Sequence, residues 1–342
     1  MPITIGLMGF GRIGRNLFRM LSRSDDIRIG AISDTADPEA LTYLVRYDTM
    51  LGRFPDLVSY KNGHLYTYGR EIPLLQGKDP GDVRWSDYDV DYVVEATGRG
   101  RSRAELQRHL DAGARRVVIC TPPKDKPDIS VVYGVNDHRL RAEHKLVSNA
   151  SNTAHCAAPI LAALHGAYGI ERAHITSIHA ITSIQRLADV PADDLRLSRA
   201  AAQNIVPSDT NAAAVLEEVL PELRGKLRAS ALRVPVTNGS IVDMTLWLAK
   251  SAAKDGINEV IRTAAAGPYK QILEYNEDPI VSSDVVATSY SSIFDSQATM
   301  TMEGNLAKVI AWFDNGWGYA QRVVDLVQRF DEMDAQLAEE GR

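Results

Sequence analysis

Residues 3–15, ITIGLMGFGRIGR, contain a short apolar run followed by three glycines in G-x-G-x-x-G spacing. The stretch 12–21 has the composition of a helix, and a second apolar run, 27–32, leads to Asp34. Strand, glycine turn, helix, strand and acid follow one another in the order that a dinucleotide-binding site requires. The sequence therefore predicts a Rossmann-type βαβ unit here.

The three glycines have separate roles in such a unit. Gly9 makes the tight turn, Gly11 lets the backbone approach a pyrophosphate, and Gly14 lets the helix pack on the strand. The free N–H groups and positive dipole at the helix N-terminus attract the anion. Asp34 can accept hydrogen bonds from both ribose hydroxyls and would repel a 2′-phosphate, so NAD is predicted rather than NADP. The alternative is a glycine turn in an unrelated α/β protein.

Strand-like and helix-like stretches continue to alternate beyond this unit. Helical stretches such as 103–112 separate three β-rich runs, at 92–94, 117–119 and 146–147. Several βα units in series predict a parallel sheet with helices on both faces.

Three arginines, Arg99, Arg101 and Arg103, follow the segment Glu95-Ala96-Thr97-Gly98. That segment ends one of the predicted strands, at the edge where open α/β sheets bind ligands. Two interpretations remain open for the arginines. They form a solvated basic turn, or they contact cofactor phosphates, including the 2′-phosphate that would distinguish NADP.

Length and composition limit the class of protein. A chain of 342 residues predicts two domains, each large enough to bury its own core. A 45% hydrophobic and 24% charged composition is typical of soluble globular proteins, and no apolar run reaches the roughly 18 residues of a membrane helix. The net charge of −6 argues against a nucleic-acid or anionic-membrane partner.

Two cysteines, Cys120 and Cys156, are too few for a disulfide scaffold or a cysteine-based zinc site, so no metal is expected. This cysteine usage suits the reducing cytoplasm. The first residues have no basic segment ahead of their apolar run, so a signal peptide is not expected.

The pattern changes at about residue 151. A helix is expected from Ser151 to about His165 and a last helix from Gln321 to about Ala338. Between them the sequence predicts β-rich runs at 173–184, 231–249 and 307–313, with a polar loop at 187–205.

Eight motifs in one order now link the chain to a known family. They are GFGRIGR (9–15), YGVN (133–136), SNAS (148–151), RAAAQNIVPS (199–208), LPELRGKL (220–227), RVPV (233–236), SSIFD (291–295) and DNGWGY (314–319). With them, the chain resembles the glyceraldehyde-3-phosphate dehydrogenase family over essentially its whole length.

The resemblance implies an α/β fold with two domains. Residues 1–150 would form an NAD-binding Rossmann domain with a doubly wound parallel sheet, completed by a C-terminal helix at 320–338. Residues 151–319 would form an α+β catalytic domain with a mixed sheet. The family is usually a homotetramer, in which the loop at about 182–205 packs near a neighbour's cofactor.

The resemblance also implies a set of site residues. Those assigned to the cofactor are Gly9, Phe10, Gly11, Arg12, Ile13, Gly14, Asp34, Thr97, Gly98, Cys120, Asn315 and Tyr319. Those assigned to a substrate anion or inorganic phosphate are Ser151, Thr153, Thr182, Arg199, Thr210 and Arg233. His179 matches the family's general base, and Asn315 matches the residue that holds the nicotinamide carboxamide.

One position departs from the family's motif. Where the family reads SNASC-TTN-C, this sequence reads SNASNTAHC at 148–156, so Asn152 stands where the nucleophilic cysteine is expected. An amide cannot form a thiohemiacetal or a thioester, because it has no ionisable nucleophilic form. Phosphorylating oxidation of an aldehyde through an acyl-enzyme is therefore expected to fail.

Two neighbours of Asn152 could compensate. Cys156 shares its helix face at i+4 and is expected to point into the core as a small hydrophobe, with a catalytic thiol as the alternative. His155, where the family has an asparagine, is either a packed, hydrogen-bonded histidine or a new acid–base group facing the cofactor.

Three functions follow from these residues. The preferred one is an NAD-dependent oxidoreductase that acts on a small phosphate- or phosphonate-bearing carbonyl or alcohol by direct hydride transfer, with His179 as acid–base group and Asn152 as a donor to the oxyanion. The second is a catalytically silent, NAD-binding pseudoenzyme. The third is a phosphorylating aldehyde dehydrogenase that uses Cys156.

Overall fold

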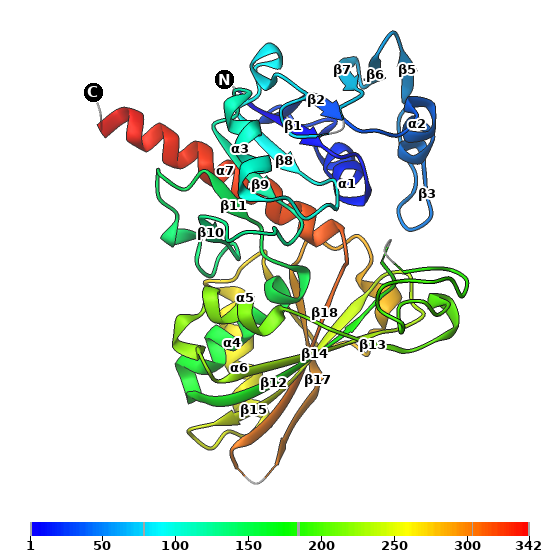
Figure 1. Ribbon diagram of the computed structural model, residues 1–342. Helices are drawn as coiled ribbons and strands as arrows, with labels where there is room; N and C mark the ends of the chain where they lie inside the picture. The colour runs from blue at the N-terminus through cyan, green and yellow to red at the C-terminus, as the bar shows by residue number, and fades with distance from the viewer. Residues whose placement is uncertain (1, 78, 183–184, 303, 341–342) are drawn as a thin grey trace. The chain divides into compact units, whose positions relative to one another are not determined.

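The computed structural model describes residues 2–77, 79–182, 185–302 and 304–340. The chain forms two compact units. Unit 1 comprises the chain up to Tyr133, the segment Arg139–Ala150 and the C-terminal segment from Ala320, and unit 2 comprises Gly134–His138 and Ser151–Tyr319. Each unit is built around one large sheet (Figure 1).

Unit 1 contains a nine-stranded sheet in the order β10-β11-β9-β8-β1-β2-β7-β6-β5. The strands from β10 to β7 pair in parallel, and β7, β6 and β5 form antiparallel hairpins. The bounds of these strands are β1 Ile3–Met8, β2 Ile27–Ser33, β5 Ser59–Lys61, β6 His64–Thr67, β7 Arg70–Leu75, β8 Tyr92–Glu95, β9 Arg116–Ile119, β10 Ile129–Ser130 and β11 Leu146–Ser148. A short ribbon joins β3 Tyr47–Asp48 to β4 Gly52–Arg53.

The helices of unit 1 follow its strands, as the alternating pattern predicted. They are α1 Arg12–Leu21, α2 Pro38–Arg46 and α3 Arg103–Asp111. β1 is buried along its whole length because it lies between β2 and β8. Parallel strands with crossover helices confirm the predicted Rossmann-type fold of this half.

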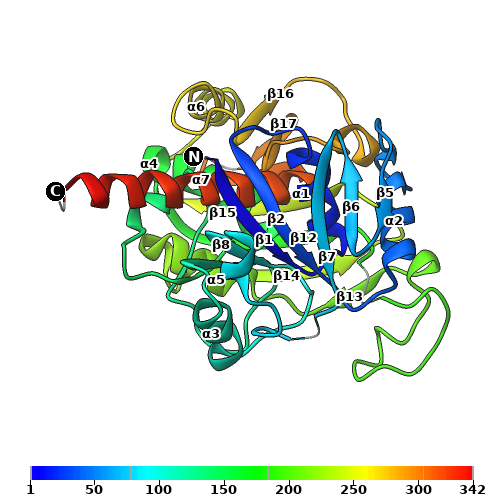
Figure 2. The same ribbon diagram turned by 90° about the horizontal axis from the view of Figure 1, so that it is seen from above.

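The last helix, α7 Trp317–Glu340, packs on the sheet of unit 1 around Phe330 and Asp334, and its C-terminal end extends beyond these contacts (Figure 2). The ring of Phe330 lies 5.4 Å from that of Tyr92 and 5.3 Å from the guanidinium carbon of Arg116. Arg116, which is 1% exposed, donates to Asp334 at 2.6 Å, and the Tyr92 hydroxyl donates to the same carboxylate at 3.0 Å. This pair of a buried guanidinium with a half-buried carboxylate fastens α7 to β8 and β9.

Unit 2 contains a seven-stranded mixed sheet in the order β13-β14-β12-β15-β18-β17-β16. Its strands are β12 Ile170–His179, β13 Val206–Ser208, β14 Leu227–Arg233, β15 Ser240–Leu248, β16 Leu273–Asn276, β17 Ser292–Met302 and β18 Leu306–Phe313. The helices α4 Asn152–Tyr168, α5 Ala212–Val219 and α6 Lys254–Ala266 pack against this sheet (Figure 1). The predicted mixed sheet of the second half is confirmed.

Three predicted elements were wrong in extent. The run 231–249 is two strands, because the chain turns at 234–239 and Gly239 has a φ of 78° there; a Cβ on Gly239 would overlap the carbonyl oxygen of Ser282. β12 ends at His179, so residues 180–182 are not in a strand, and the predicted end of that run, Ile184, lies outside the described residues. α7 begins at Trp317, four residues before the predicted start.

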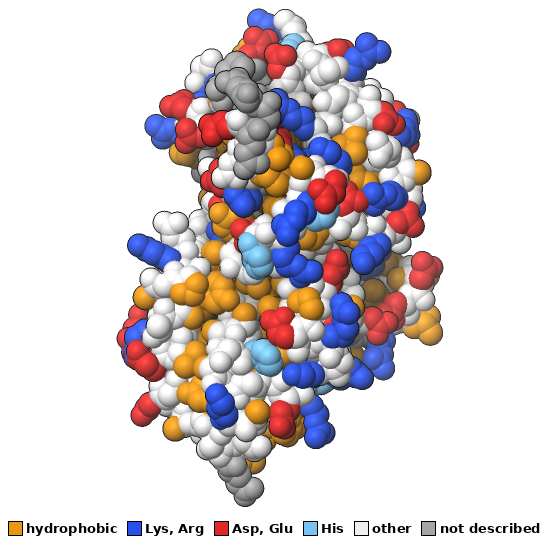
Figure 3. Space-filling view, turned by 90° about the vertical axis from the view of Figure 1, so that its left-hand side faces the viewer, with side chains coloured by type: hydrophobic (Ala, Val, Ile, Leu, Met, Phe, Trp, Pro, Cys, Tyr) orange, Lys and Arg blue, Asp and Glu red, His pale blue; other side chains and the backbone are white. Residues whose placement is uncertain are grey.

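Basic and acidic side chains are interspersed on the face shown in Figure 3, without a large patch of one sign. Within the described part of the chain, no helix is both long and apolar enough to cross a membrane.

We expect Asp334→Ala to lower the free energy of unfolding by about 3 kcal/mol, because Arg116 would remain buried without its partner. Glu332→Ala is the control, since the pair of Glu332 with Arg329 on the same helix is exposed and is worth less than about 1 kcal/mol. Urea unfolding of the full chain measures both changes. Equal losses in the two variants would contradict a structural role for the buried pair.

The buried pair also has a defined pH dependence. Burial by itself would raise the pKa of Asp334, but the hydrogen bond and positive charge of Arg116 outweigh it and lower the pKa below its ordinary value. The stabilisation is therefore fully present above the unfolded-state pKa of about 3.9 and is lost as the pH falls through the folded-state pKa.

Candidate active site

The glycine turn between β1 and α1 has the geometry of a dinucleotide site. Gly9 has a φ of 100°, and a Cβ there would lie 2.6 Å from the backbone of Ala96 and Thr97. A Cβ on Gly14 would overlap the carbonyl oxygen of Gly9, whereas one on Gly11 would meet nothing within 4 Å. Gly9 and Gly14 thus serve chain packing, and the space at Gly11 is open.

The N-terminus of α1 is suited to an anion. Its N-cap, Gly11, supplies no side-chain hydrogen bond to the first turn, and no acidic residue lies in that turn. The first N–H groups of a helix need partners from outside it, and a phosphate is a common one. Arg12 is exposed and Ile13 is half-buried at this end of the helix.

Asp34 lies beside the turn and holds its conformation. One carboxylate oxygen accepts from the backbone N–H of Phe10 at 2.7 Å, and the other accepts from that of Ala36 at 2.9 Å. Each oxygen retains a second lone pair, and the side chain is only half-buried. Asp34 can therefore support the turn and still accept from ribose hydroxyls.

At the carboxyl end of β8, a buried carboxylate holds the next predicted cofactor residue. Glu95 is 1% exposed and accepts from both the N–H and the hydroxyl of Thr97. On its other side, His109 lies 3.3 Å away. The indole N–H of Trp85 donates to His109 Nδ1 at 3.0 Å, so His109 Nε2 must carry the proton that it shares with Glu95.

Local sequence does not reveal this network, because His109 lies 14 residues after Glu95 and Trp85 lies 10 residues before it. Of the other residues predicted to bind the cofactor, Gly98 is exposed, and Cys120, which follows the last residue of β9, is half-buried.

The three neighbouring arginines have different surroundings. Arg101 is 4% exposed and pairs with Asp79 at 2.9 Å and Glu105 at 3.4 Å, so it is neither a solvated side chain nor available to a phosphate. Arg103 pairs with Asp128 at 2.5 Å. Arg99 remains exposed. Both interpretations are therefore wrong for Arg101, because its shortest ion pair is with Asp79, which lies 22 residues away in the sequence.

The second group of predicted residues lies in unit 2. Ser151 caps α4 by accepting from the N–H of Ala154 at 3.2 Å, and Asn152 is the first residue of the helix. Asn152 Nδ2 donates to the carbonyl oxygen of Asn315 at 2.9 Å. Its Oδ1 is buried and has no hydrogen-bond partner among the described residues. The structure thus places Asn152 beside Asn315, 163 residues away.

His179 is the last residue of β12 and lies beside the same asparagine. Its Nδ1 is 2.7 Å from the carbonyl oxygen of Ala180 and 3.2 Å from Asn315 Nδ2. A carbonyl can only accept, so the shorter contact places the proton on Nδ1 and leaves Nε2 as the basic nitrogen of neutral His179. The Phe313 ring packs edge-on against the imidazole at 5.8 Å.

Cys156 lies one helical turn beyond Asn152 but in a different environment. It is fully buried, and the single hydrogen of its thiol is shared between Ser292 Oγ at 3.5 Å and the carbonyl oxygen of Trp312 at 3.8 Å from Sγ. Burial raises the pKa of the thiol to about 12. The thiolate is the nucleophilic form, and its fraction at neutral pH is then negligible. The expectation that Cys156 is a core residue is confirmed.

His155 is 2% exposed and packs edge-on against the ring of Tyr319, with centroids 5.9 Å apart. Tyr319 lies four residues after Asn315 in the chain, and His155 lies three residues after Asn152. The packed-histidine interpretation therefore agrees with its burial.

Some of the predicted anion ligands have a buried polar atom without a described partner, and the others are already paired within the protein. Arg233, at the end of β14, is aligned with His179 in the parallel pairing of β14 with β12, so both side chains lie on one face. Burial lowers the pKa of Arg233, and its Nη1 has no partner among the described residues. Arg199 is exposed and pairs with Asp189 at 3.0 Å. Thr182 Oγ1 is buried and also lacks a described partner.

Asp189 therefore neutralises Arg199, whereas no carboxylate among the described residues pairs with Arg233. Asp243 pairs with Lys308 at 2.7 Å. Thr153 and Thr210 already bond within the protein. Thr153 Oγ1 lies 3.2 Å from Ser177 Oγ, and Thr210 Oγ1 accepts from the N–H of Ala212 at 3.2 Å.

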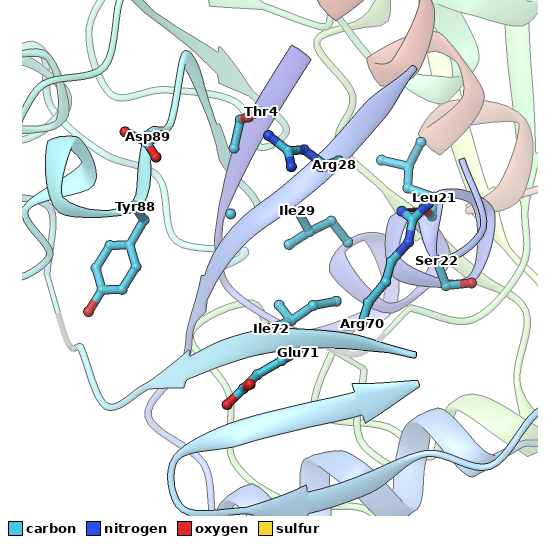
Figure 4. Close-up of a pocket in the computed structure, with 11 residues that line it drawn as sticks. Thr4, Leu21, Ser22, Arg28, Ile29, Arg70, Glu71, Ile72, Tyr88 and Asp89 are labelled. Carbon is cyan, nitrogen blue, oxygen red and sulfur yellow. Dashed lines mark hydrogen bonds between the residues drawn. The ribbon is translucent and has the colours of Figure 1, made fainter. Parts of the chain in front are cut away.

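A cavity of about 460 Å³ in unit 1 contains none of the predicted site residues. It lies near the amino-terminal ends of β1 and β2, opposite the edge that bears the glycine turn (Figure 4). Its lining includes two arginines and two acidic residues, Arg28, Arg70, Glu71 and Asp89, so its charges are balanced.

The reactivity of the buried thiol of Cys156 can be measured separately from that of the half-buried thiol of Cys120. We expect a small thiol reagent at pH 8 to leave Cys156 unmodified in the native protein and to modify it after denaturation, because the buried thiol is neither accessible nor ionised. Cys120→Ser removes the half-buried second thiol and isolates this signal. Rapid labelling of native Cys120→Ser protein would show that Cys156 is reactive.

Comparison with known proteins agrees with this geometry. Residues 3–103 match the family model described as glyceraldehyde 3-phosphate dehydrogenase, NAD binding domain, and residues 151–315 match the C-terminal domain of the same family. The first match confirms NAD as the expected cofactor.

Individual relatives resemble the chain over almost its whole length. Glyceraldehyde-3-phosphate dehydrogenase of Geobacillus stearothermophilus is 42% identical over 327 residues, which are 95% of this chain and 97% of the relative. The proteins of the same name from Mycolicibacterium smegmatis and Borreliella burgdorferi are 45% and 44% identical, covering 96% and 95% of this chain and 98% of each relative. The chain therefore belongs to the glyceraldehyde-3-phosphate dehydrogenase family of NAD-dependent oxidoreductases.

Proposed function

We propose that this member of the family interconverts an alcohol and a carbonyl on a small phosphate- or phosphonate-bearing molecule, without a cysteine-bound intermediate. The observation that supports this most strongly is the pair of residues on α4. Asn152 stands at the open end of the helix, where the family's motif has its nucleophilic cysteine, and the remaining thiol, Cys156, is fully buried with a pKa of about 12.

NAD, when bound, supplies the hydride acceptor and donor. The protein must then move one proton and hold the substrate. His179 Nε2 takes the hydroxyl proton in the oxidative direction and returns it in the reductive direction, because Nδ1 is already bonded to Ala180.

Asn152 and Arg233 would hold the two ends of the substrate. Asn152 Nδ2 uses one hydrogen on the Asn315 carbonyl and retains a second, which can donate to the substrate oxygen as negative charge develops there. Arg233, which has no carboxylate within ion-pair distance among the described residues, would bind the phosphate-like group.

We assign residues 1–150 and the helix at 320–338 to the NAD-binding domain and residues 151–319 to the catalytic domain. We also propose a cytoplasmic homotetramer. Three apolar side chains in and beside the loop at 187–205 support association, because Leu187, Leu195 and Ile205 are between 66% and 82% exposed. The remaining cofactor and phosphate residues predicted from the sequence keep those roles as part of this proposal.

A second candidate is the phosphorylating oxidation of glyceraldehyde 3-phosphate, the compound that the relatives' names give as the one dehydrogenated. High identity over the whole chain favours it. In this chain it would need Cys156 as nucleophile, and both the burial and the pKa of that thiol oppose the assignment.

We expect no NADH formation from glyceraldehyde 3-phosphate, NAD and inorganic phosphate above the background rate, because the two-step covalent route lacks its nucleophile. Cys156→Ser should not change this result. Asn152→Cys should recover little activity, since Ala154 and His155 also differ from the family motif. Robust wild-type turnover that Cys156→Ser abolishes would make Cys156 the nucleophile and overturn the proposal.

The proposed reaction can be sought by following NADH oxidation with two- to four-carbon carbonyl compounds that carry a phosphate or phosphonate. With the compound that reacts, His179→Ala should lower the rate by about 10²–10⁴ and spare NAD binding. Arg233→Ala should chiefly raise the KM, and Arg199→Ala should raise it less, because Arg199 already has a carboxylate partner.

The outcomes separate the alternatives. An unchanged rate in His179→Ala would leave the proton transfer to another group, and His155 would be tested next. No turnover with any compound, together with tight NAD binding, would support the pseudoenzyme.

A further inference from the structure

Asn315 is held by the protein on several sides. It is 5% exposed, and its backbone N–H donates to Asn238 Oδ1 at 2.8 Å. Its side-chain Oδ1 accepts from Ser240 Oγ at 2.7 Å. The backbone and the side chain of Asn315 are therefore fixed by separate partners, both of which come from the turn between β14 and β15 and the first residue of β15.

The direction of the bond between Ser240 and Asn315 follows from a third group. The backbone N–H of Ala180 donates to Ser240 Oγ at 2.9 Å. A backbone N–H can only donate, so Ser240 Oγ accepts there and directs its own hydrogen at Asn315 Oδ1. This arrangement keeps the amide oxygen of Asn315 on the Ser240 side and turns Nδ2 toward His179.

The nitrogen so placed has no acceptor in His179. Asn315 Nδ2 is 3.2 Å from His179 Nδ1, but that nitrogen donates its hydrogen to the carbonyl oxygen of Ala180. Two donors face each other across this contact. If the Asn315 amide were reversed, its oxygen could accept from His179 Nδ1, so the hydroxyl of Ser240 opposes a reversal that would otherwise be favourable.

We propose that Ser240 is a positioning residue that sets the orientation of the Asn315 amide, so that Asn315 presents N–H donors rather than an oxygen to the carboxamide oxygen of the nicotinamide. The proposal rests on the assignment of Asn315 to the nicotinamide in the proposed function. Ser240 itself is fully buried and acts only through Asn315. Local sequence gives no sign of this role, because a serine within the predicted run 231–249 has no local feature that marks it.

The test compares two ligands of the full-length protein by titration calorimetry. NAD contains the nicotinamide, whereas ADP-ribose contains the rest of the cofactor without it. We expect Ser240→Ala to weaken NAD binding about tenfold, which corresponds to about 1.4 kcal/mol, and to leave ADP-ribose binding within about twofold. Equal weakening of both ligands, or no weakening of either, would overturn the proposal.

Ser292→Ala is the matched control. Ser292 is also a fully buried serine in the sheet of unit 2, and its hydroxyl accepts from Cys156 rather than contacting Asn315. We expect this variant to bind both ligands as the wild type does. A selective loss of NAD binding in Ser292→Ala as well would show that any buried serine in this sheet has the effect.

A second variant keeps the proposal testable if Ser240→Ala does not fold. Asn315→Ala removes the amide that Ser240 is proposed to orient, so it should show the same NAD-selective loss. In that background Ser240→Ala should add less than a twofold change. If each substitution instead weakened NAD binding by its own factor and the two factors multiplied in the double variant, the proposal would be contradicted. Failure of wild-type protein to bind NAD more tightly than ADP-ribose would instead contradict the assignment of Asn315 to the nicotinamide.

Discussion

The buried carboxylate of Asp314 organises the centre of unit 2. It accepts hydrogen bonds from Asn238 Nδ2 at 2.7 Å, from the N–H of Ala287 at 2.9 Å, and from the N–H groups of Gly316 and of Trp317, the first residue of α7. A buried carboxylate is stable only when its lone pairs are satisfied in this way. Because Asp314 immediately precedes Asn315, these bonds fix where β18 ends, where α7 begins and where Asn315 lies.

The other residues of the candidate site are placed with respect to this fixed point. Asn152 donates to the carbonyl oxygen of Asn315, and Ser240 holds its amide oxygen. His179 lies beside its nitrogen, and Arg233 is aligned with His179 on the next strand. The site thus draws on the start of a helix and the ends of three strands, which packing holds at defined positions.

Helix geometry explains why the two candidate positions on α4 differ so strongly. Residues four apart lie on the same helix face but one turn apart along the axis. Asn152 is at the open N-terminus, whereas Cys156 has already entered the core beneath β17 and β18. A thiol that serves packing at one position cannot replace a group at the other without moving the helix.

The sequence by itself determined the βαβ unit at the N-terminus, the two-part architecture and the helical placement of Asn152 and Cys156. These features depend on glycine spacing, apolar periodicity and residues a few positions apart, so local sequence is enough to predict them. It also placed His179 and Asn315 in one site by resemblance. The observed bounds of several elements differ from the predicted ones, because turns such as 234–239 depend on what the chain packs against.

Only the tertiary structure decided how the polar groups pair. Arg101 meets Asp79, Arg199 meets Asp189, and Arg233 meets no described carboxylate, although all three are arginines. The hydroxyl of Ser240 reaches Asn315 across 75 residues of chain. Pairing energies depend on burial and on distances between atoms that are remote in sequence, and the folded chain alone sets those two quantities.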